Sequence, residues 1–136
     1  MKQITVKDLD YEDDGRVSYE GQLFTGLATD YWASGQLAAE VNYVDGLIDG
    51  EVKERHQNGV LKEVSFYRKG EMNEKTEMHE NGQIKLKGEY ESGIALWEKK
   101  WDSEGNLLSD YILTEENQQY KSLQIIRKIK AEQEIK

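Results

Sequence analysis

The chain has 136 residues, with 18 basic and 27 acidic side chains and a formal net charge of −9. It contains no cysteine, which excludes disulfides, thiolate catalysis and cysteine-based zinc sites. The net negative charge opposes binding to nucleic acid or anionic lipid and favours a basic partner. The sequence shows neither a signal-like segment nor an apolar run long enough to span a membrane. We therefore expect one cytoplasmic domain.

Residues 1–18 predict an N-terminal strand, at 3–7, followed by an acidic turn. Asp10, Glu12 and Asp14 match the first ligand positions of a calcium loop. The bidentate glutamate that closes such a loop is missing, because Gly21 occupies its position. The favoured interpretation is a solvated acidic turn, and calcium binding by the three acids is the weaker alternative.

Residues 19–113 contain an internal repeat of about 23 residues, after a degenerate first unit. The units are marked by a first series of glycines. An aliphatic residue lies two positions after each of these glycines, and a tyrosine lies eight positions after each of the first three glycines. A second glycine series alternates with the first. The first series is Gly35, Gly59, Gly82 and Gly105, and the second is Gly21, Gly46, Gly70 and Gly93.

Each unit predicts two short strands and two turns. Both glycine series follow residues such as Asn or Asp, which favours two-residue hairpin turns. Residues 37–43 alternate in polarity as strands do. We therefore predict an all-β repeat, an elongated single-layer antiparallel meander of about four two-stranded units. The aliphatic and tyrosine columns would share one face, opposite a polar acidic face, if no bulge intervened.

Residues 114–136 predict a C-terminal amphipathic helix. Thr114 is a suitable N-cap, and the residues from Tyr120 to Ile129 place an apolar stripe on one side. We expect this helix to cap the sheet by covering its last strand, since open edges invite aggregation. A partner-binding helix is the alternative.

The repeat resembles the variant MORN repeat of bacteria. The segment Tyr31–Leu37, followed by Glu40, Tyr43 and a closing Asp45–Gly46 pair, carries the pattern, and the resemblance covers about residues 19–113. It implies an antitoxin, or an immunity protein of a polymorphic toxin system, that binds and neutralises a cognate toxin domain. The core motifs of the eukaryotic repeat are missing, so its lipid and membrane roles are not implied.

Signals of enzymatic chemistry are missing from the sequence. His56 and His79 share a repeat column that Trp32 and Asp102 fill in other units, which indicates a packing position, because a metal or acid–base pair needs fixed ligands. No nucleophile elbow or phosphate-binding glycine loop occurs. We therefore expect that the protein is not an enzyme and that it binds no cofactor.

The aromatic and acidic side chains together favour a protein-binding surface. Residues 26–113 carry net charge −7 and could mimic the polyanion that a basic nuclease toxin binds. We expect a monomer when free, binding neither nucleic acid nor membrane. A structural scaffold or self-assembling module is the alternative, and a calcium-dependent module is less favoured. The predicted contact residues are Asp30, Tyr31, Trp32, Glu40, Tyr43, Glu54, Glu63 and Tyr67.

Overall fold

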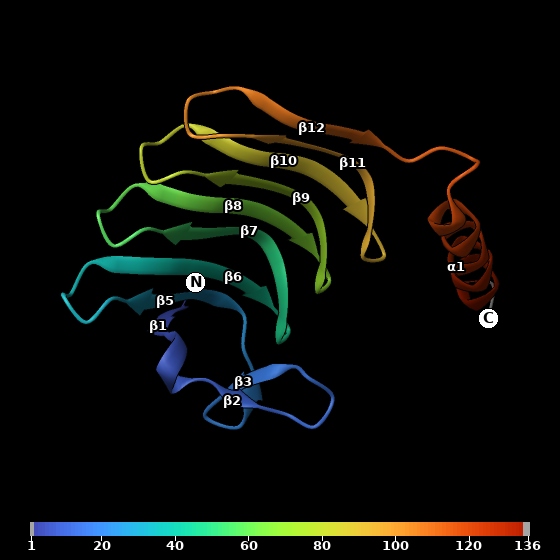
Figure 1. Ribbon diagram of the computed structural model, residues 1–136. Helices are drawn as coiled ribbons and strands as arrows, with labels where there is room; N and C mark the ends of the chain where they lie inside the picture. Colours follow the sequence, from blue (N-terminus) through green and yellow to red (C-terminus); the bar gives the residue numbers. More distant parts are fainter. Residues whose placement is uncertain (1, 135–136) are drawn as a thin grey trace.

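The main body of the protein is a curved, nine-stranded sheet in a single layer (Figure 1), in a computed structural model that describes residues 2–134. Strands β5 to β12 are antiparallel and pair in chain order, which confirms the predicted meander. Strand β1 joins at the N-terminal edge, parallel to β5. The strands are β1 (Lys2–Thr5), β5 (Gly26–Tyr31), β6 (Leu37–Val44), β7 (Leu47–Arg55), β8 (Leu61–Arg68), β9 (Glu71–Met78), β10 (Ile84–Glu91), β11 (Ile94–Trp101) and β12 (Leu107–Ile112).

A second, three-stranded sheet packs against the N-terminal end of the first (Figure 1). It is built from β2 (Asp10–Tyr11), β3 (Val17–Tyr19) and β4 (Gln22–Leu23), and a 3-10 turn, η1 (Val6–Asp8), leads into it. The rings of Phe24 and Tyr43 meet edge to face, with centroids 5.9 Å apart. The core cluster is Leu9, Val17, Phe24, Ala28 and Tyr43, so the protein's best-packed region lies at this end.

The second glycine series forms two-residue hairpin turns, as predicted. The residue before each glycine also has a positive φ, for example 48° at Asp45 and 49° at Lys69, which is the type I′ geometry. Gly46 has an additional role, because a Cβ there would lie 2.7 Å from the carbonyl oxygen of Val17. Only glycine allows this turn to approach β3 so closely.

The first glycine series forms a different turn, so the two-residue prediction is wrong there. At the β5–β6 connection, only Gly35 has a positive φ. The Trp32 N–H donates to the Gln36 carbonyl, and the Gly35 N–H donates to the Trp32 carbonyl, both at 2.8 Å. This pattern is a type I turn followed by one left-handed glycine, and it recurs at Gly59, Gly82 and Gly105.

Each of these longer loops is followed by a β-bulge, which changes the predicted faces. In β6, Leu37 pairs with Tyr31 but Ala39 pairs with Asp30, so Ala38 is the extra residue. Leu37 therefore lies on the face opposite to Ala39 and Tyr43. The aliphatic and tyrosine columns do not share a face. Equivalent bulges occur at Lys62, Lys85 and Leu108.

The C-terminal helix, α1 (Gln118–Glu134), lies beside the two-residue turns of the later hairpins (Figure 1). Arg127 forms two 2.8 Å hydrogen bonds to the Glu91 carboxylate, and Lys130 Nζ lies 3.0 Å from Glu71 Oε1. These contacts tie α1 to β9 and β10. On β12, the last strand of the sheet, Leu108 and Ile112 remain 66% and 69% exposed.

Candidate functional site

One row of directly paired residues crosses the sheet from β5 to β12. The pairing places carboxylates at four of its first five positions and a leucine and a lysine at the next two. The row is Asp30, Ala39, Glu54, Glu63, Glu77, Leu86, Lys100 and Ser109. Paired residues share a face, and two-residue steps along β6, β8 and β10 reach the tyrosines. We call this side, which carries Tyr43, Tyr67 and Tyr90, the tyrosine face.

The acidic half of the row forms the carboxylate row, defined as Asp30, Glu54, Glu63 and Glu77. Glu63 pairs with Glu54 on one side and Glu77 on the other, so three like charges stand side by side, which is unfavourable. Lys75 lies 3.1 Å from Glu77. Among the described residues, neither Glu54 nor Glu63 forms an ion pair.

The repulsion between the carboxylates of this row contributes to a raised pKa at Glu63. Burial raises the pKa of its carboxyl above the ordinary value, and the charges of Glu54 and Glu77 raise it further. Lys75 and Lys62 act in the opposite direction without cancelling the effect. The folded sheet therefore holds excess negative charge that an external cation would relieve.

The tyrosines stand beside the carboxylates on the same face. Burial, followed by the charges of Glu63 and Glu54, raises the pKa of the Tyr67 hydroxyl. The Tyr90 hydroxyl donates a 2.6 Å hydrogen bond to Glu98, and Lys75 Nζ lies 5.5 Å from the Tyr90 ring centroid. Tyr67 is half-buried and Tyr90 is buried, so Tyr67 offers the more accessible ring.

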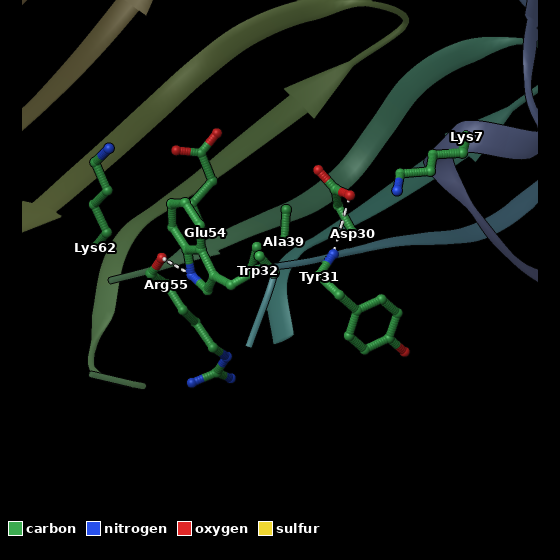
Figure 2. A pocket seen from close by; sticks show the side chains of 10 residues that line it. Lys7, Asp30, Tyr31, Trp32, Ala39, Glu54, Arg55 and Lys62 are labelled. Atoms are coloured by element: carbon green, nitrogen blue, oxygen red, sulfur yellow. Dashed lines mark hydrogen bonds between the residues drawn. The ribbon is translucent and has the colours of Figure 1, made fainter. Parts of the chain in front are cut away.

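A cavity of about 480 Å³, the N-terminal cavity, opens where β5, β6 and β7 meet the longer loops. Figure 2 shows Asp30, Trp32 and Glu54 side by side in it, with Lys62 and Lys7 flanking them. The Asp30 carboxylate accepts a hydrogen bond from the Tyr31 backbone N–H, its single hydrogen bond to a described residue. The cavity therefore combines an aromatic wall with two carboxylates that form no ion pair within the described chain.

The Trp32 ring is held in place by the next repeat unit. Its indole N–H donates to the Arg55 carbonyl at 3.3 Å. The same column continues with His56, which bonds the Met78 carbonyl at 3.0 Å, and His79 bonds the next unit in the same way. A carbonyl only accepts, so the histidine Nε2 carries the proton in each bond. The predicted packing column is thus a ladder of hydrogen bonds between units.

The predicted contact residues fall into two groups. Asp30, Trp32 and Glu54 line the N-terminal cavity, and Glu63 and Tyr67 continue the same face. Tyr31 also borders the cavity, but it pairs with Leu37 on the opposite face, and its ring points away from Asp30 (Figure 2). Glu40 and Tyr43 do not join them. Glu40 lies on the opposite face, 3.6 Å from Arg55, and Tyr43 is buried in the core cluster.

The acids of the possible calcium loop do not converge on one point. Glu12 accepts a hydrogen bond from the Ser18 hydroxyl, and Asp14 accepts one from the Arg16 N–H, so both are engaged within the β2–β3 hairpin. Within residues 2–134, no group of three or more histidine, aspartate or glutamate side chains could hold a metal ion. Over the same range, no helix is both long and apolar enough to cross a membrane.

Sequence reasoning missed Glu77 and Lys75 as members of the charged row. Glu54 and Glu77 occupy the same repeat position, five residues before Gly59 and Gly82, which is a signal that could have found Glu77. Lys75 needed the strand register, because its role depends on lying two residues from Glu77 on the same face.

Comparisons with known proteins bear on the repeat itself. The family model described as MORN repeat variant matches residues 24–45 and 48–69, which confirms the predicted resemblance for these two units. No curated protein matches the sequence significantly. One similar solved chain belongs to a crystal structure of accessory secretory protein 1, 2 and 3 in Streptococcus pneumoniae, at 12% identity and a TM-score of 0.40. The alignment covers 82% of this chain but only 19% of that chain.

Proposed function

We propose that this MORN repeat-containing protein is a cytoplasmic immunity protein or antitoxin that binds a basic toxin domain and occludes its active site. The observation that carries the proposal is the carboxylate row, in which Asp30, Glu54 and Glu63 share one face without an ion pair to any of residues 2–134. Three carboxylates in this condition gain most from a partner that brings cations.

The surroundings of the row supply the rest of a binding surface. Trp32 and Tyr67 stand next to these carboxylates, and Trp, Tyr and charged anchors dominate protein interfaces. On the opposite face of β6 and β7, by contrast, the carboxylates of Glu40 and Glu51 lie within 4 Å of Arg55 and Lys53, so these two are already paired with cations. We therefore assign to the tyrosine face both the electrostatic attraction of the basic partner and the contact with it.

A capture-and-rescue experiment tests this proposal. The wild-type protein and a Glu54→Lys, Glu63→Lys double variant would each be used to retain proteins from the native cell extract. We expect a basic protein that only the wild type retains, that arrests growth when expressed alone, and whose toxicity the wild type suppresses. A retained partner that is harmless, or that the double variant retains equally, would contradict the proposal.

The double variant needs a control for charge alone. Lysines at Glu115 and Glu116, which are exposed in the segment between β12 and α1, add the same positive charge away from the row. This variant should retain the partner and the rescue, because the general attraction is weakened equally but the local carboxylates are intact.

A self-assembling scaffold is the second candidate, and the open edge strand β12 favours it. Exposed edges with apolar side chains are templates for pairing, and Leu107 and Ile112 are 54% and 69% exposed. At this end of the sheet, however, Asp102 occupies the position of the ladder histidines. Its carboxylate accepts hydrogen bonds from the backbone N–H groups of Glu104 and Asn106 in its own loop, so the ladder has no histidine here to continue into a second copy. Native mass spectrometry at low concentration separates the two candidates, since a scaffold is oligomeric without a partner.

A further inference from the structure

A second cavity, of about 500 Å³, lies at the other end of the tyrosine face, between β9 and β12. Leu86 is buried, at 8% exposure, while Leu108 is 66% exposed. Trp101 also borders the cavity, but it pairs with Leu107, so its side chain lies on the face opposite to Lys100 and Leu86. The arrangement gives this C-terminal cavity a fixed apolar floor and an open apolar rim.

The charged groups around this cavity are mostly neutralised within the protein. Glu77 pairs with Lys75 at 3.1 Å, and Lys100 pairs with Glu98 at 3.7 Å. Asp102 is bonded to its own loop. The cavity therefore differs from the N-terminal cavity, whose carboxylates form no ion pair with the described residues, and the exposed side chain of Leu108 is the apolar surface that it offers a ligand.

The cross-strand row connects the two cavities. Glu54 lines the first, and Leu86, which lies three strands further along the row, lines the second. Three strand spacings correspond to about 14 Å. An extended peptide covers that distance in about four residues.

We propose that the C-terminal cavity binds a large apolar side chain of the same basic partner, about four residues along an extended segment from a cationic residue that contacts Glu54 and Glu63. This inference rests on the proposed function and specifies the recognised chemistry. The segment is basic because the row is acidic at β7 and β8. It carries an apolar side chain because the same row becomes apolar at β10. Apolar anchors in such pockets typically carry much of the binding energy.

A random dodecapeptide library, selected on the full-length protein, tests the proposal. We expect selected peptides to contain Arg or Lys and, about four residues away, a leucine or an aromatic residue. The strongest peptide would then be synthesised and its affinity measured by fluorescence anisotropy. Leu108→Lys should weaken its binding about tenfold or more, as loss of a buried apolar contact does.

Leu107→Lys is the matched control, because Leu107 is the preceding residue on β12 and is also exposed, but does not line the cavity. It should leave the affinity unchanged within about twofold, and circular dichroism would establish that both variants fold. Glu54→Lys should abolish binding.

The outcomes separate this inference from the proposed function. Peptides that depend on Glu54 but bind Leu108→Lys normally would overturn the apolar anchor and leave the basic-partner proposal standing. A selection that yields no peptide, or only peptides indifferent to Glu54, would overturn the inference, while the capture-and-rescue experiment decides the proposed function separately. Leu108-dependent dimers in native mass spectrometry would show that a second copy of this chain occupies the cavity, which would also overturn the inference.

Discussion

The Tyr90 ring lies over Gly88 of its own strand, so that a Cβ on Gly88 would come 2.6 Å from the tyrosine hydroxyl oxygen. Gly88 pairs with Lys75 and, through it, with Ser65. Ser65 lies two residues before Tyr67, as Gly88 does before Tyr90. The residue two positions before the tyrosine is therefore small in both units, and at Gly88 the reason is the Tyr90 ring that lies over it.

Replacing Gly88 with alanine should destabilise the protein by about 2 kcal/mol, the typical cost of overpacking a filled site. Tyr90 would have to leave its place and lose the hydrogen bond to Glu98. Urea denaturation monitored by tryptophan fluorescence measures the change. Ser65→Ala is the comparison, since the Ser65 hydroxyl is buried without a hydrogen-bond partner among the described residues; this variant should be as stable as the wild type or more so. Equal losses for both variants would contradict the packing argument.

Removing the central charge of the carboxylate row should stabilise the protein at neutral pH. The pKa of Glu63 is raised in the folded state, so folding favours the protonated carboxyl. The cost is absent at low pH, and it appears as the pH rises from the ordinary value of 4.5 through the raised pKa. Glu63→Gln should therefore gain about 0.5 kcal/mol at pH 7 and little at pH 4.

Glu40→Gln is the matched control for this pH series. Glu40 lies on the opposite face beside Arg55, so neutralising it removes an attraction and should give no gain. The free energy of unfolding would be measured between pH 4 and pH 7 for the three proteins. A gain for Glu63→Gln that is the same at both ends of this range would show that charge repulsion is not its cause.

The sequence was sufficient to predict the meander, because the repeat places turn residues and alternating stretches in step. It could not predict the side on which each column lies. The extra residue at each bulge, such as Ala38, carries no sequence mark of its own, yet it inverts the parity between Leu37 and Tyr43. The predicted separation into an apolar and an acidic face was wrong for this reason.

The candidate site was half predictable for a related reason. Asp30, Tyr31 and Trp32 are consecutive, and Glu54 lies one period after Asp30, so the repeat itself brings them to one cavity. Tyr43 belongs to a repeat column that is more accessible at Tyr67. Tyr90 in the same column is buried as well. Tyr43 is additionally packed into the N-terminal core cluster, a tertiary contact that the period does not show.

The ladder between units should contribute measurably to stability. His56→Ala removes the hydrogen bond to the Met78 carbonyl and leaves that acceptor without its side-chain partner, so we expect a loss of about 1 kcal/mol. Gln57→Ala is the control at the next, exposed position and should change the free energy of unfolding little. Chemical denaturation of both variants measures the difference, and equal effects would show that the ladder adds nothing.

The docking of α1 should depend on its two ion pairs. Arg127→Ala removes both hydrogen bonds to Glu91, so amide hydrogen exchange in residues 118–134 should become faster, while β5 to β12 stay protected. Lys128→Ala, one residue along the exposed side of the helix, is the matched control and should exchange like the wild type.

Acid should release the helix in the same way. Hydrogen bonds from Arg127 and Lys130 lower the pKa of Glu91 and Glu71, so their contribution to docking is present above the ordinary value of 4.5 and is lost as the pH falls through the lowered pKa. NMR relaxation should show α1 gaining mobility in the wild type as the pH falls below 4.5, whereas in Arg127→Ala the Glu91 share of this change should be missing. An α1 that stays rigid in both proteins would mean that the buried Leu123, only 1% exposed, holds the helix without the ion pairs.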